Sequence, residues 1–240
     1  MEERVVLLLK FFSEKIHREE FISGLLFTNS MGYYVKNEGE QNKGRGDNLE
    51  GIVRAEKVKG MILQDKETGR IITPSLSSFT ANFEGVSDTH IFCMTIMEFD
   101  WLKETESGLQ YIIPKEVLEV FRSEYGEYVC LVPAKEFINQ VNTASKNQNL
   151  ESIYNPVEYF DVKKFWAERM IAVNSDKFFF QKNVRYLNEH EFRIVFKNVH
   201  GDKPVKINLG NPIKVVDNIE TIDDLINFLE SKIIKINYDK

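Results

Sequence analysis

Strand patterns in this sequence follow one another in runs instead of alternating strictly with helical patterns. Four of them lie between residues 59 and 98: Lys59–Gln64, Arg70–Thr73, Ser78–Glu84 and His90–Glu98. The segment Asp65–Gly69 (DKETG) is typical of a hairpin connection between the first two. Such runs favour an α+β fold with a mixed, largely antiparallel sheet flanked by helices. No internal repeat or domain boundary stands out, so residues 1–240 are expected to form a single domain.

The beginning of the chain predicts a strand, a helix and a second strand. The apolar run Val5–Phe12 (VVLLLKFF) suits a buried strand, with a short buried helix as the alternative. Ile16–Ser23 has a helical pattern, and Gly24 is a plausible C-terminal stop. Leu25–Thr28 (LLFT) then reads as a short strand.

The later part of the chain is predicted to contain both helices and strands. Its predicted helices are Pro114–Tyr125, Ala134–Ala144, Lys163–Ile171 and Thr221–Ser231, the last capped by Thr221. Its predicted strands are Tyr128–Val132, Val157–Phe160 and Glu191–Phe196, with Val205–Leu209 and Ile213–Val216 as a pair around a GNP turn; Ile233–Tyr238 closes the chain. The polar stretch Ser145–Asn155 is predicted to be a linker loop.

Charge and cysteine content narrow the class of protein. A net charge of −6 argues against a broad nucleic-acid-binding surface, although 31 Lys and Arg leave room for a local basic groove. Cys93 and Cys130 lie in apolar stretches and are expected to be buried structural thiols. The run Val5–Leu9 is too short for the apolar core of a signal peptide, and no run approaches a membrane span. We therefore expect a cytoplasmic protein.

The late segment E-H-E-F-R is the first candidate for chemistry. Alternation in a strand would place Glu189, Glu191 and Arg193 on one face and His190 and Phe192 on the other. Two carboxylates and a guanidinium on one face could form a catalytic or ligand-binding surface, because the cation keeps one carboxylate ionised. The alternative is a solvated strand face with an ion pair.

A polar segment at residues 29–48 is the second candidate, and it is predicted to be a loop or a partly ordered flap. Tyr33 and Tyr34 could stack on a base or a nicotinamide ring, and Arg45 could clamp a phosphate. We expect the nearby Asp47 and Glu50, together with Arg45, to meet the E-H-E-F-R segment in space. A hydrophilic surface loop is the alternative.

A third candidate is the aromatic run Phe178–Arg185 (FFFQKNVR). Aromatic rings interleaved with Lys182 and Arg185 could contact a nucleotide or nucleic acid. The favoured interpretation is a core-facing aromatic run that ends in solvated charges.

Three motifs together resemble a broad group of uncharacterised bacterial and phage proteins, several of which sit among phage-defence genes. The first is G-L-L-F-T at Gly24–Thr28, followed by a Y-x(3)-E element and R-G-D-x-x-E-G at Arg45–Gly51. The last is F-x-K-x(3)-Y-x-x-E-x-E-F-R at Phe180–Arg193. This resemblance implies a role in conflict between bacteria and phage.

The layout is also similar to the ADP-ribosyltransferase fold, whose members hold NAD in a cleft between two small sheets. The resemblance implies that Glu191 or Glu189 binds the nicotinamide ribose and stabilises an oxocarbenium-like transition state, while the other orients a macromolecular acceptor. Tyr33 or Tyr34 would stack on nicotinamide, and Arg45 and Arg193 would help to hold the cofactor.

Two other functions remain open from the sequence. One is a non-catalytic binding protein that recognises a protein or nucleotide partner through the Tyr33–Glu50 segment. The other is a nuclease with a metal held by carboxylates from both motifs, although no spacing singles out such a site.

Overall fold

A computed structural model gives the fold of most of the chain. The described residues are 6–41, 52–82, 85–106, 108–161 and 176–232, and within them side chains are described except at 37–41, 52–63 and 72–82. The predicted helix Lys163–Ile171 and the closing segment Ile233–Tyr238 lie outside these ranges.

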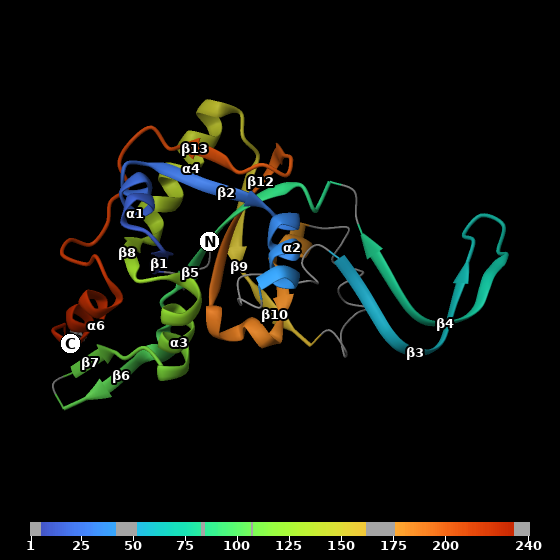
Figure 1. Cartoon of the computed structure of the whole chain (residues 1–240), viewed down its shortest axis with the longest axis horizontal. Helices are drawn as coiled ribbons and strands as arrows, with labels where there is room; N and C mark the ends of the chain where they lie inside the picture. Colours follow the sequence, from blue (N-terminus) through green and yellow to red (C-terminus); the bar gives the residue numbers. More distant parts are fainter. Residues whose placement is uncertain (1–5, 42–51, 83–84, 107, 162–175, 233–240) are drawn as a thin grey trace, which may run out of the picture.

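The body is built on a seven-stranded sheet whose strand pairs are all antiparallel (Figure 1). Its main path runs β13-β2-β5-β1-β8, and β12 pairs with both β5 and β9. The strands are β1 (Leu7–Phe12), β2 (Leu25–Ser30), β5 (Thr89–Ile96), β8 (Tyr128–Pro133), β9 (Ser152–Pro156), β12 (Glu191–His200) and β13 (Val205–Asn208).

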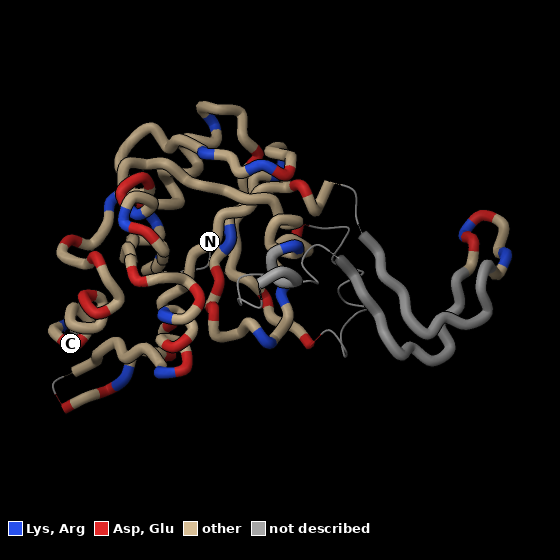
Figure 2. Tube along the Cα trace, in the orientation of Figure 1, with Lys and Arg blue, Asp and Glu red and all other residues tan. Residues whose placement is uncertain are grey.

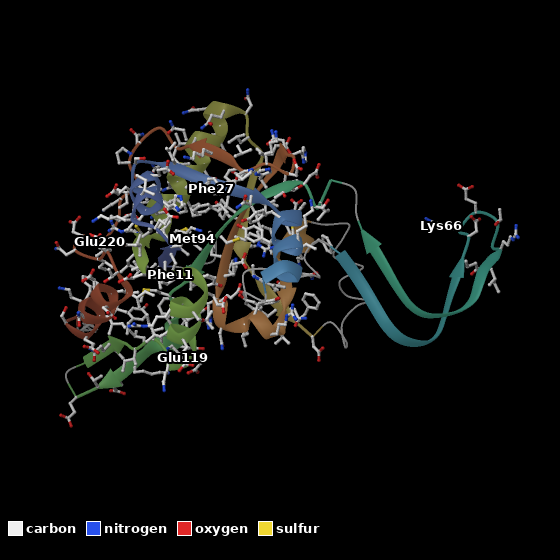
Figure 3. All side chains as sticks on the ribbon, in the orientation of Figure 1. Phe11, Phe27, Lys66, Met94, Glu119 and Glu220 are labelled. Atoms are coloured by element: carbon white, nitrogen blue, oxygen red, sulfur yellow. The ribbon has the colours of Figure 1, made fainter. Side chains whose placement is uncertain are left out.

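Three two-stranded ladders complete the β structure: β3 (Ile52–Gln64) with β4 (Ile71–Asn82), β6 (Leu102–Thr105) with β7 (Gly108–Tyr111), and β10 (Glu158–Phe160) with β11 (Gln181–Asn183). Only the last is parallel. The β3–β4 hairpin extends away from the body and carries Lys66 near its tip (Figures 1 and 3). The predicted α+β class with a largely antiparallel sheet is confirmed.

Helices cover the sheet on both sides. The α-helices are α1 (Lys15–Ile22), α2 (Met31–Gln41), α3 (Lys115–Val120), α4 (Ala134–Gln148) and α6 (Ile222–Glu230). The 3-10 turns are η1 (Phe99–Trp101), η3 (Asp176–Phe180) and η4 (Val184–Glu189), and η2 (Phe121–Tyr125) is a π-helix that continues α3. Lys, Arg, Asp and Glu are interspersed along the chain of the body (Figure 2).

Two apolar layers hold the helices to the sheet. On one side Phe21 of α1 and Phe137 of α4 contact Phe92 of β5, with ring centroids 5.9 to 6.3 Å apart. On the other side Phe121 and the apolar face of α6 pack on Leu9 and neighbouring residues of β1 and β8. Leu8 and Leu9 of β1 are neighbours in sequence and both are fully buried, because the strand lies between these two layers.

Three predictions about local structure are wrong, each for a tertiary or capping reason. In the segment predicted as a loop at 29–48, residues 29 and 30 belong to β2 and residues 31–41 to helix α2, because the Ser30 hydroxyl accepts the Tyr33 N–H and caps the helix; residues 42–48 lie outside the described ranges. The predicted linker at 145–155 is instead the end of α4, terminated by Asn149 with φ of 53°, followed by β9.

The third error concerns the GNP turn. Strand β13 pairs with β2 rather than with residues 213–216, which form no strand. The Ile213 N–H bonds the Ile22 carbonyl and the Val216 N–H bonds the Leu131 carbonyl, so this segment is tied to two other parts of the fold. Composition around the turn does not encode those partners.

Candidate functional site

Two strands share one edge of β5, and the space between them forms a fork. Strand β2 pairs with β5 at Ile91 and His90, whereas β1 pairs with the same strand at Thr95 and Ile96. Between these contacts Phe92, Cys93 and Met94 have no strand partner on that edge. The sheet therefore splits around the middle of β5.

A cleft of about 770 Å³ opens at this fork. Its walls carry many aromatic rings, and Figure 3 marks Phe11, Phe27 and Met94 among the lining residues. Phe27 is 51% exposed and lies on β2. The volume and lining are typical of a site for a small organic ligand.

A buried cluster of opposite charges lines this cleft. The Lys182 ammonium donates to Glu189 Oε2 at 2.5 Å and to Glu191 Oε2 at 3.0 Å. Arg193 Nε donates to Glu191 Oε1 at 2.7 Å, and Arg193 Nη1 donates to the Phe179 carbonyl at 2.7 Å. No side chain of these four charged residues is more than 7% exposed. We call these residues (Lys182, Glu189, Glu191 and Arg193) the charge cluster.

Three different elements bring the charge cluster together. Alternation along β12 places Glu191 and Arg193 on one face, as predicted, with Phe192 in the core on the other. Glu189 is not part of the strand: it ends the 3-10 turn η4, and His190, with φ of 45°, turns the chain between the two acids. Lys182 comes from β11.

Burial contradicts the alternative of a solvated strand face. A buried charge needs paired charges and hydrogen bonds to offset its lost hydration, and Glu191 has both. Burial opposes its ionisation, but Arg193 and Lys182 outweigh burial and hold the pKa of Glu191 well below its ordinary value of 4.5. Glu191 is therefore a carboxylate at neutral pH.

Uncharged groups complete the surroundings of Glu191. The Cys93 thiol hydrogen-bonds its carboxylate, and the Glu191 N–H donates to Tyr159 Oη at 2.8 Å. Burial and then the Glu191 charge raise the pKa of both Cys93 and Tyr159. Burial and the Glu189 charge likewise raise the pKa of Tyr125. These groups stay protonated and act as hydrogen-bond donors or acceptors without charge.

Tyr125 also lines the cleft, near the charge cluster. It lies at the end of the π-helix η2 and stacks on Phe11 with ring centroids 5.8 Å apart. The following Gly126 has φ of 105°, and a Cβ there would lie 2.5 Å from the Phe12 carbonyl oxygen. This close approach fixes the wall to the end of β1. Single-turn π-helices are frequent at functional sites.

The other predicted site residues have mixed outcomes. Tyr33 and Tyr34 both line the cleft, but from helix α2 rather than from a loop, and their rings meet edge to face at 5.5 Å. Arg45 lies outside the described residues, as do Asp47 and Glu50, so their expected meeting with the E-H-E-F-R segment stays a prediction.

Arg193 is occupied within the protein. Its bonds to Glu191 and to the Phe179 carbonyl make it a support for the carboxylate, at 1% exposure. The expectation that it would help to hold the cofactor stays a prediction.

The prediction that Lys182 is a solvated charge is wrong, and the sequence predicts no role for Lys10. In the run Phe178–Arg185 the aromatic part is core-facing as predicted, since Phe178 and Phe180 are buried, but Lys182 is buried with them. The signal for Lys182 was present: it is the Lys of the F-x-K-x(3)-Y-x-x-E-x-E-F-R motif. No local pattern marks Lys10, whose role depends on β5.

The two cysteines also differ. Cys130 is buried, and burial raises its pKa to about 11, as expected for a structural thiol. Cys93 is only partly buried and lines the cleft, so the expected full burial is confirmed for Cys130 alone.

The described part of the chain contains no group of three or more His, Cys, Asp or Glu side chains that could hold a metal ion. Nor does any helix there have the length and apolar character needed to cross a membrane.

No protein-family model, curated protein or solved structure matches the chain. The assignment of function therefore rests on the cleft and its chemistry.

Proposed function

We propose that the cleft binds NAD or a related nucleotide and that the chain is an ADP-ribosyltransferase-like enzyme. One observation carries the proposal: an ionised carboxylate, Glu191, lines an aromatic cleft of about 770 Å³ with Glu189 beside it. Breaking the bond between nicotinamide and ribose develops positive charge on the ribose. A fixed carboxylate stabilises that charge.

The charge cluster gives each acid a separate role. Arg193 bonds one oxygen of Glu191 and orients the carboxylate, so Glu191 is the acid that faces the developing charge. Lys182 is shared between the two acids, and a ribose hydroxyl that bonds Glu191 would leave Lys182 on Glu189. Glu189 then orients the acceptor.

Aromatic residues would hold the rings of the ligand. Tyr33 and Tyr34 line the cleft from α2, and Phe27 lies exposed on β2. Rings of this kind stack on the planar groups of a nucleotide. Lys206 also lines the cleft, where it pairs with Glu20 at 2.6 Å, and it would supply positive charge toward a phosphate.

A turnover assay with NAD tests the proposal. Wild-type protein is expected to be stabilised by NAD and to release nicotinamide, and Glu191→Gln is expected to lose release by about 10²-fold or more. The exposed Glu158→Gln on β10 is the matched control and should release nicotinamide at the wild-type rate. Absence of both stabilisation and release in the wild type, across acceptors, would contradict the proposal.

The second candidate is a non-catalytic binding protein. It is favoured by the saturation of Glu191, whose two oxygens already accept bonds from Arg193 and Lys182. Tyr33, 42% exposed at the cleft, would then contact the partner. NAD binding without nicotinamide release in the assay above would select this candidate.

A further inference from the structure

The backbone of β5 presents the N–H and C=O of one residue, Cys93, to the fork. Successive residues of a strand point their N–H and C=O groups to opposite edges. The Ile96 N–H bonds the His190 carbonyl, and therefore residues 96, 94 and 92 face β12. Cys93 must face the other way, into the fork between β1 and β2.

A second hydrogen bond fixes the same direction independently. The Val157 N–H bonds the Glu191 carbonyl, so the peptide groups of Glu191 and Arg193 face β9 and not β5. Cys93 is opposite Arg193 in the ladder and gains no bond from it. The hydrogen bonds of β5 and of β12 therefore both indicate that the Cys93 N–H and C=O face the cleft.

Of the Cys93 N–H and C=O, only the C=O has a hydrogen-bond partner among the described residues. The Cys93 carbonyl accepts a bond from Lys10 Nζ at 2.7 Å, whereas its N–H pairs with neither β1 nor β2 and bonds no other described residue. Lys10 lies over the Phe92 ring, 4.5 Å from its centroid. An N–H donor and an ammonium thus lie side by side at the fork.

We infer that the fork is a binding site for a carbonyl or carboxylate oxygen carried on a planar ring. The Cys93 N–H donates to that oxygen, and the Lys10 ammonium supplies the neighbouring positive charge. Cys93 is the one residue of β5 whose N–H and C=O face the fork, since Ile91 and Thr95, which face the same edge, pair with β2 and β1. It therefore accepts an end group rather than an added strand.

The aromatic lining of the cleft favours a planar ring as the carrier of the oxygen. Phe11, Phe92 and Tyr125 are among the lining residues, and such rings stack on planar groups. The site does not depend on the proposed transfer reaction, because a ligand can bind the fork whether or not Glu191 takes part in catalysis.

Amide hydrogen exchange in the wild-type protein is the first test. In the free protein the Cys93 amide is expected to exchange faster than the amides of Phe92 and Met94, which lie in the β5–β12 ladder. Benzoate and benzamide are expected to slow exchange at Cys93 and to move its amide proton resonance downfield. Toluene, which has the ring without the oxygen, should do neither.

Variants of Lys10 separate charge from packing. Lys10→Met is expected to weaken benzoate binding about tenfold or more, and Lys10→Arg should retain most of it. If Lys10→Met does not fold, Lys10→Arg and the comparison of benzoate and benzamide with toluene still test the inference. Slow exchange of the Cys93 amide in the free protein, or an equal shift with toluene, would overturn the inference.

The outcomes are distinguishable from those of the proposed function. Benzoate binding at Cys93 without nicotinamide release from NAD would keep this site and remove the enzyme proposal. Nicotinamide release with no response at Cys93 to any probe would do the reverse.

Discussion

Replacing Lys182 by Met should destabilise the protein strongly, because Lys182 is the cation shared by two buried acids. The wild-type charge cluster has two cations and two carboxylates, with Lys182 3.0 Å or less from both acids. In Lys182→Met, Arg193 alone faces Glu189 and Glu191. Met has a similar apolar stem, so packing changes little while one buried positive charge is lost.

The magnitude follows from the burial of the group. Removing one partner of a buried ion pair costs about 3–5 kcal/mol of unfolding free energy. For a chain of this size each kcal/mol lowers Tm by roughly 2–4 °C, which gives a fall of about 6–20 °C. The exposed Lys135→Met on α4 is the control and should stay within about 0.5 kcal/mol of the wild type.

In Lys182→Met the two acids should also make stability depend on pH in the direction opposite to that of Glu191 in the wild type. In the wild type the pKa of Glu191 is depressed on folding, so its contribution is present above pH 4.5, the ordinary value, and is lost as the pH falls below it. In Lys182→Met two like charges share one cation, which raises the pKa of the pair. The variant should therefore become more stable, relative to the wild type, as the pH falls from 8 toward 5.

A double variant completes the test. Lys182→Met with Glu189→Gln restores one cation and one acid, and it should recover at least about half of the loss. Urea denaturation of the wild type, Lys182→Met, the double variant and the control Lys135→Met at pH 5 and pH 8 measures the unfolding free energy of each. Wild-type stability in Lys182→Met, with no difference between the two pH values, would refute the assignment of Lys182 to a buried cluster.

Three smaller changes test the local structure by denaturation. His190 has φ of 45°, so His190→Val should cost about 1–2 kcal/mol more than His190→Asn; equal losses would contradict the turn. Thr221 and Asp224 form a capping box at α6, and Thr221→Ala should cost about 1 kcal/mol, with an unchanged Tm as the opposing result. Gly126→Ala should cost roughly 2 kcal/mol or more, because its φ is positive and the new Cβ would meet the Phe12 carbonyl; wild-type stability would show that this approach is not close.

Local patterns predicted the elements whose causes are local. The apolar run at β1 and the cap of α6 at Thr221 both depend on residues within a few positions. Alternation on β12 placed Glu191 and Arg193 on one face, because a strand has a period of two. The same alternation does not extend to Glu189, because His190 turns the chain and Glu189 lies outside the strand.

The site itself depends on contacts between segments distant in sequence. Lys10 and Cys93 are 83 residues apart, and their hydrogen bond exists only because β1 and β2 divide one edge of β5. Lys182 appeared solvated because a charged residue after aromatic ones is usually exposed. Its burial is stabilised by two acids whose approach requires the turn at His190 and the pairing of β11 with β10.

Carbon-13 NMR of the Glu191 side-chain carboxyl, recorded across pH with and without NAD, tests the central claim most directly. The account predicts that this carbon keeps the shift of a carboxylate well below pH 4.5, for as long as the protein stays folded, and that NAD moves the signal. Titration near pH 4.5 or above, together with no response to NAD, would contradict both the electrostatics of the cluster and its place in the ligand site.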